Sequence, residues 1–195
     1  EDRNADDPDQ KLSSKRRART NGSAAEVSAA WSRALRATLE SFPAPPRGDE
    51  NIRLVDARGD DSEALAASSD GAQCLRLLLR LASRATATAI HVAPKGDSVH
   101  VRLRVDGGMV WIAELPNDVY DLVTGLVRTA CHMPQAAKTA VLDGHFSSRF
   151  PDRRIEYRVS LTPSSQGAKL GVRVREQRGV PTAIEDLGLV GYMRE

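Results

Sequence analysis

The sequence predicts an α/β fold of the α+β kind, in which helices flank one sheet of mainly antiparallel strands. From residue 88 onward, apolar residues recur at every second position in several segments, which is the spacing of a strand with one buried face. In other segments they recur three and four residues apart, which is typical of an amphipathic helix. The Asp106-Gly107 pair is a tight-turn signal between two strand segments, so it favours their antiparallel pairing.

Three segments show the helical spacing. The first covers residues 23–42, where Ser23 and Glu26 form a capping-box pattern; the second begins near Asp70 and the third near Asn117. Their apolar faces consist of Val27, Trp31, Ala34, Leu35 and Leu39; of Leu75, Leu78, Leu79 and Ala82; and of Val119, Leu122, Val123, Leu126 and Val127. The first helix needs a partner surface, which is either its own domain or another protein, and both interpretations remain open.

Six segments show the strand spacing. They span residues 52–57, 89–94, 98–105, 109–115, 155–161 and 170–174. In the third segment, Val101 and Leu103 alternate with Arg102 and Arg104, so the aliphatic and guanidinium side chains are predicted on opposite faces of the sheet. Turn chemistry accounts for three aspartates, namely Asp106, Asp143 and Asp152. A capping-box pattern at Thr182 and Glu185 predicts one last short helix.

Composition divides the chain into segments. Residues 1–22 join an acidic stretch to a basic one without any apolar period, so we expect a disordered tail. Residues 43–69 are rich in Pro, Gly, Asp and Ser and are predicted to form a linker, after which the compact domain begins near residue 70. Because the chain begins with Glu1 rather than methionine, we expect it to be a fragment or a processed product.

Bulk composition narrows the class of protein. The 195 residues are 41% hydrophobic and 28% charged, which suffices for one core. The net charge of +2 is too small to predict nucleic-acid binding, so no specific nucleic-acid partner is expected. The two cysteines form no disulfide framework, which favours a reduced cytoplasmic setting. The sequence shows no signal-peptide pattern and no stretch near the roughly 20 apolar residues of a membrane span.

Arginines recur at every second residue in three of the predicted strands. They are Arg102 and Arg104, Arg154 and Arg158, and Arg173 and Arg175. Side chains two residues apart in a strand share a face, so a common sheet would have one electropositive face. Like charges on neighbouring strands repel each other, and an anionic partner would relieve that repulsion. The alternative is an ordinary solvated face on which Glu156 and Glu176 provide local pairing.

Catalytic motifs are absent from the sequence. The chain contains no Gly-Lys pair and therefore no P-loop, so we expect no ATP hydrolysis by this chain alone. Neither His-Glu-x-x-His nor Gly-x-Ser-x-Gly occurs. Four histidines lack any metal-ligand spacing, so no metal site is predicted, and each is interpreted as a packed or solvated residue: His91, His100, His132 and His145.

Six motifs follow one another over residues 75–189. A Leu-rich helix precedes TAIHVAP, VRLRVDG, LDGHF, RVSLTPSSQGAKLGVRV and IEDLGL. In this order they resemble the N-terminal domain of the type II secretion and type IV pilus-assembly ATPases (traffic ATPases), which carries R-x-R-x-DG, PQDGR and a closing DLGL. The chain departs from that pattern at Thr88-Ala89, Val141-Leu142, His145 and Ala168, and it lacks the arginine of the family's S-R-I-K segment. It therefore resembles a divergent member, for which weakened nucleotide coupling is an expectation.

The resemblance implies a PAS-like domain over residues 70–190, followed at 191–195 by the start of a linker to an ATPase domain that this chain lacks. In such enzymes, arginines of the N-terminal domain approach the nucleotide phosphates when the two domains close. The matching residues are Arg102 and Arg104, with Arg158 and Arg173 as further candidates.

The resemblance also implies the surroundings of the domain. ATP and Mg²⁺ belong to the parent enzyme, and no cofactor is expected in this chain. The implied partners are the ATPase domain of the same or a neighbouring subunit, a homo-hexameric ring and an inner-membrane platform protein, at a cytoplasmic location peripheral to the inner membrane. Two alternatives remain: a stand-alone protein-interaction module, or a PAS-like sensor, which a closed apolar pocket inside the sheet would favour.

Overall fold

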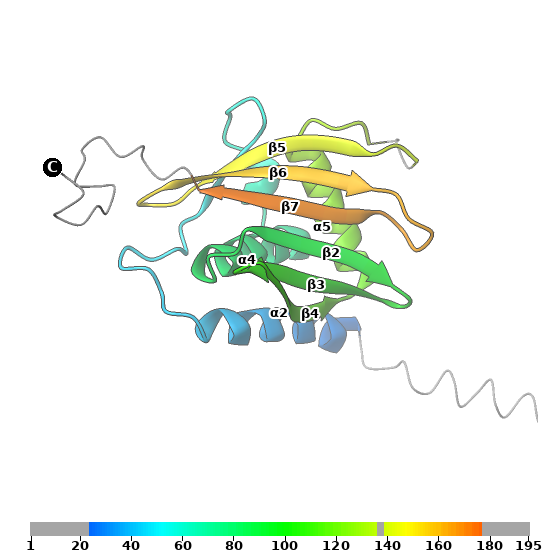
Figure 1. The fold of residues 1–195 in the computed structure, drawn as a ribbon, viewed down its shortest axis with the longest axis horizontal. Coiled ribbons are helices and arrows are strands. Elements are labelled where there is room, and N and C mark those ends of the chain that lie inside the picture. Colours follow the sequence, from blue (N-terminus) through cyan, green and yellow to red (C-terminus); the bar gives the residue numbers. More distant parts are fainter. Residues whose placement is uncertain (1–23, 136–138, 177–195) are drawn as a thin grey trace, which may run out of the picture.

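A computed structural model describes residues 24–135 and 139–176, and all structural statements below concern these residues. They form a seven-stranded antiparallel sheet with flanking helices, so the α+β prediction is confirmed (Figure 1). In chain order the elements are α2 (Ala24–Glu40), β1 (Arg53–Val55), α3 (Glu63–Ala66), α4 (Asp70–Arg84), β2 (Ala89–Lys95), β3 (Ser98–Val105), β4 (Gly108–Leu115), α5 (Asn117–Ala130), β5 (Leu142–Arg149), β6 (Arg154–Thr162) and β7 (Lys169–Glu176).

Two three-stranded meanders meet at the centre of the sheet. The spatial order is β1-β5-β6-β7-β2-β3-β4, so β2 lies between β7 and β3. Ala89 of β2 is opposite Arg173 of β7 on one side and opposite Arg104 of β3 on the other. The hairpin between β3 and β4 turns at Asp106 and Gly107, both with positive φ, as the sequence predicts.

The helices α4 and α5 lie behind the sheet in Figure 1, and α2 runs beside β4. The strand residues that point toward the helices are buried, among them Val101 and Leu103 of β3, and the aromatic rings of Phe146 and Tyr157 stack at 4.9 Å between centroids. Within the described parts of the chain, no helix covers the opposite face of the sheet.

The amphipathic helix α2 packs on its own domain. Trp31, Leu35 and Leu39 are buried, and α2 contacts both α4 and β4. Two positions that the sequence assigns to apolar helix faces are nevertheless exposed: Ala34 of α2 and Leu122 of α5, the latter at 49%. Both lie at the border of their helix faces, where burial ends.

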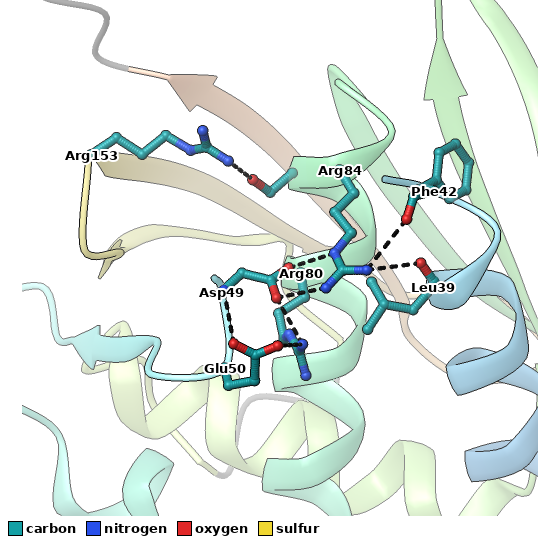
Figure 2. A network of polar contacts seen from close by, with 8 residues as sticks. Leu39, Phe42, Asp49, Glu50, Arg80, Arg84 and Arg153 are labelled. Carbon is teal, nitrogen blue, oxygen red and sulfur yellow. Dashed lines mark hydrogen bonds and ion pairs between the residues drawn. The ribbon is translucent and has the colours of Figure 1, made fainter. Parts of the chain in front are cut away.

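A buried ion pair joins the loop after α2 to α4 (Figure 2). Arg84 Nε donates to Asp49 Oδ2 at 2.7 Å and Arg80 donates to Asp49 Oδ1 at 2.7 Å. Arg84 also donates to the carbonyl oxygens of Leu39 and Phe42, at the end of α2. Residues 43–69, which the composition marks as a linker, thus contribute Asp49, β1 and α3 to the folded structure.

The strand β5 is absent from the sequence prediction, and the prediction that Asp143 lies in a turn is wrong. Asp143 is paired within β5, opposite Ser160 of β6. Gly144 lies on the helix-facing side of β5. Because glycine has no apolar side chain, the sequence of this strand does not show apolar residues at every second position. A Cβ atom at Gly144 would lie 2.7 Å from Met133 Cε, so close packing favours glycine there. The predicted last helix and the tail at residues 1–22 lie outside the described residues.

Candidate anion-binding site

The uncovered face of the sheet brings together the four arginines that the sequence analysis singles out. Arg158 of β6 is directly opposite Arg173 of β7. Arg173 and Arg104 are both opposite Ala89, so one strand separates them, and Arg102 is opposite His91. The four guanidinium groups therefore come from β3, β6 and β7 and surround the central strand β2.

These arginines line an open hollow of about 1100 Å³, which we call the arginine hollow. Small residues at its centre leave room for a ligand, because Ala89 and Ala93 of β2 and Gly171 of β7 carry little or no side chain. The polar side chains that line it include Arg102, Arg104, Arg158, Arg173, His91 and Lys169. A hollow of this size accommodates a small-molecule ligand.

The positive charge of the arginine hollow is largely uncompensated. Arg102, Arg104 and Arg173 are exposed, and none of their guanidinium groups forms a salt bridge or hydrogen bond with another described residue. Arg158 Nε lies 3.8 Å from Glu156 Oε1, a loose and exposed ion pair of little energetic value. Partial burial lowers the pKa of His91, and the charges of Arg104, Arg102 and Arg173 lower it further. The three arginine charges thus produce a positive electrostatic potential at the imidazole of His91.

This geometry favours binding of an anion. Guanidinium groups donate paired hydrogen bonds to phosphate and carboxylate oxygens, and four of them converge on one hollow. The carboxylates in the lining are Asp143 and Glu156. Across the part of the chain that the structure describes, no group of three or more His, Cys, Asp or Glu residues is arranged to hold a metal ion.

Sequence reasoning missed some members of the site and included others that lie elsewhere. His91 and His145 line the hollow, although the sequence analysis treats the histidines as scattered. The register carries His145 into the site, since it places this residue opposite Arg158. Arg154 and Arg175 lie outside the lining of the hollow. Arg154 donates to Ser147 Oγ at 3.1 Å and pairs across strands with Arg149.

Comparisons with known proteins show the family to which the chain belongs. The family described as "Type II/IV secretion system protein" matches residues 68–194. Type II secretion system protein E of Aeromonas hydrophila is 28% identical over 131 residues, which is 66% of this chain and 26% of that protein. Type II secretion system ATPase E of Vibrio cholerae is 25% identical, covering 67% and 27%. Type IV pilus assembly ATPase PilB of Thermus thermophilus is 29% identical, covering 58% and 13%.

The protein is therefore a member of the type II/IV secretion system protein family, related to secretion and pilus-assembly ATPases. The chain spans about a quarter of the length of the secretion-system relatives, since 26% of the Aeromonas protein and 27% of the Vibrio protein are covered. None of the described helices is both long enough and apolar enough to cross a membrane.

Proposed function

We propose that this chain is the non-catalytic N-terminal domain of a type II secretion or type IV pilus-assembly ATPase. In this proposal the arginine hollow closes over the phosphates of a nucleotide that the ATPase domain of the same or a neighbouring subunit binds. Arginines aimed at phosphate oxygens stabilise the charge of phosphoryl transfer, most strongly when closure excludes water.

The observation that carries the proposal is the convergence of Arg102, Arg104 and Arg173 without an ion-pair partner among the described residues. Arg158 and Arg173 are directly opposite each other on neighbouring strands, where exposed like charges destabilise a sheet slightly, so a bound polyanion offsets their repulsion. The lining suits phosphate oxygens better than a divalent cation, because cationic side chains outnumber carboxylates there. ATP and Mg²⁺ accordingly belong, in this proposal, with the ATPase domain.

Family membership supports a proposal for the assembly. We propose a homo-hexameric ring, in which this domain docks to neighbouring subunits, at the cytoplasmic side of the inner membrane and next to a membrane platform protein. Support comes from the relatives, which are named as secretion-system and pilus-assembly ATPases. A PAS-like description of the sheet remains a prediction.

A stand-alone interaction or sensor module is the second candidate. His145 favours it, because this residue lies on the arginine hollow at the position where the family motif PQDGR has arginine. The hollow itself is an open, cationic face, which suits an anionic partner better than the apolar ligand that a PAS-like sensor would enclose.

Binding of inorganic tripolyphosphate to the 195-residue chain tests the proposal. We expect Arg104→Gln and Arg173→Gln each to weaken binding by about fivefold, the effect of losing one exposed ion pair. Arg149→Gln is the matched control, because Arg149 is exposed on the same face but lies outside the hollow. Affinity should fall as ionic strength rises from 0.01 to 0.15 M, since the Debye length shortens from about 30 to about 8 Å. Equal losses for all three variants would rule out a specific phosphate site.

A further inference from the structure

Apolar side chains lie on the arginine face of the sheet, where Met109 lines the arginine hollow and Trp111 lies just outside its lining. The edge strand β4 places Trp111 opposite Arg102 and Met109 opposite Arg104, so both side chains lie on the arginine face. Trp111 is 56% exposed and Met109 is 44% exposed. Neighbouring exposed apolar side chains, with an indole among them, are frequent at binding surfaces.

A β-bulge directs Trp111 onto this face. Val101 pairs with Ala113, whereas Arg102 pairs with Trp111, so Ile112 is the additional residue. If the pairing at Val101 continued without a bulge, Trp111 would be opposite Leu103, whose side chain is buried under the helices. Bulges that redirect a side chain are frequent next to functional sites.

We propose that Trp111 stacks on the base of the nucleotide whose phosphates lie on Arg102, Arg104 and Arg173. The inference rests on the proposed function and adds to it a residue of this chain that contacts the base of the nucleotide. Three strand spacings, about 14 Å in total, separate β4 from β7, so the ring lies on β4 beyond the Met109 end of the hollow and the outer phosphates lie toward β7. Stacking on an exposed indole, next to a guanidinium group, favours a ligand that carries any base over a phosphate without a base.

Intrinsic fluorescence reports this contact directly. The chain contains two tryptophans, and Trp31 is only 3% exposed within the core. A base that stacks on Trp111 therefore quenches the accessible part of the emission, whereas tripolyphosphate, which has no ring, leaves it nearly unchanged.

The experiment titrates the 195-residue chain with ATP, tripolyphosphate and adenosine at low ionic strength, using fluorescence and calorimetry. We expect ATP to bind about tenfold more tightly than tripolyphosphate, which is the contribution of one base–aromatic stack. Trp111→Ala should remove this difference without changing tripolyphosphate affinity, and Trp111→Phe should retain most of it. Val110→Ala is the matched control, because Val110 is 47% exposed but is opposite Leu103, whose side chain faces the helices.

The outcomes separate the two proposals. If Trp111→Ala leaves ATP affinity unchanged while Arg104→Gln lowers it, the stacking role is wrong and the phosphate site stands. If ATP binding requires Trp111 but is insensitive to Arg104→Gln and to competing tripolyphosphate, the ring is recognised and the phosphate site is wrong. If neither ATP nor tripolyphosphate binds at millimolar concentration, both proposals are overturned.

Discussion

Asp49 links the loop after α2 to α4, and through Arg84 to the end of α2. Its side chain is 1% exposed and accepts hydrogen bonds from Arg80 and Arg84, while Arg84 also caps the carbonyl end of α2. We expect Asp49→Asn to lower the free energy of unfolding by about 3–5 kcal/mol, because it leaves two guanidinium groups without their buried counter-charge. Glu50→Gln is the control: Glu50 contacts the same Arg80 at 3.2 Å but is 67% exposed, so its loss should cost about 0.5 kcal/mol. Denaturant unfolding measures both, and equal effects would contradict the account.

The same carboxylate predicts how stability depends on pH. Burial alone would raise the pKa of Asp49, but hydrogen bonds from Arg84 and Arg80 outweigh it and lower the pKa from 3.8 to about 2. A pKa that is lower in the folded state stabilises the fold above the unfolded value. That contribution is lost as the pH falls from 3.8 toward 2. In Asp49→Asn this part of the acid sensitivity should disappear, and an unchanged acid unfolding profile would contradict the assignment.

At the scale of the element, β3 divides two roles between its faces. Leu103 is fully buried and Arg104 is exposed, although they are neighbours in the chain. We expect Arg104→Ala to change the free energy of unfolding by no more than about 0.5 kcal/mol. Leu103→Ala should lower it by about 2–5 kcal/mol, because it opens a cavity in the core. Thermal or denaturant melting of both variants checks this, and a destabilised Arg104→Ala would mean that the arginine is structural.

The strands differ in how well their sequences predict them. β3 is recognisable because Val101 and Leu103 alternate with arginines along a strand buried on one face only. β5 is not, since Gly144 and Ser148 occupy its helix-facing positions and Ser148 is buried through a hydrogen bond to Tyr157. This polar contact leaves β5 without an apolar period, although its partner β6 has one in Ile155, Tyr157 and Val159.

At the scale of the whole molecule, spacing along each strand predicts which arginines share a face, but only the strand order shows which of them meet. Because β7 pairs with β2, the C-terminal Arg173 comes to lie one strand away from Arg104. Nothing in the local sequence encodes that pairing, and the same holds for Asp49 and Arg84, which lie 35 residues apart. Resemblance to a known family supplied the long-range part of the site that periodicity could not.

The central claim is that the arginine hollow serves a nucleotide held by another domain. The most direct measurement is steady-state ATP turnover of the ATPase-bearing protein that we propose contains this chain, with Arg104→Ala compared against Arg149→Ala. We predict that Arg104→Ala lowers turnover by about tenfold or more, because a charge-stabilising donor is lost in the closed site. Arg149→Ala should leave turnover nearly unchanged, and neither substitution should change the stability of the domain much. Turnover of Arg104→Ala equal to that of the unsubstituted protein would contradict the claim.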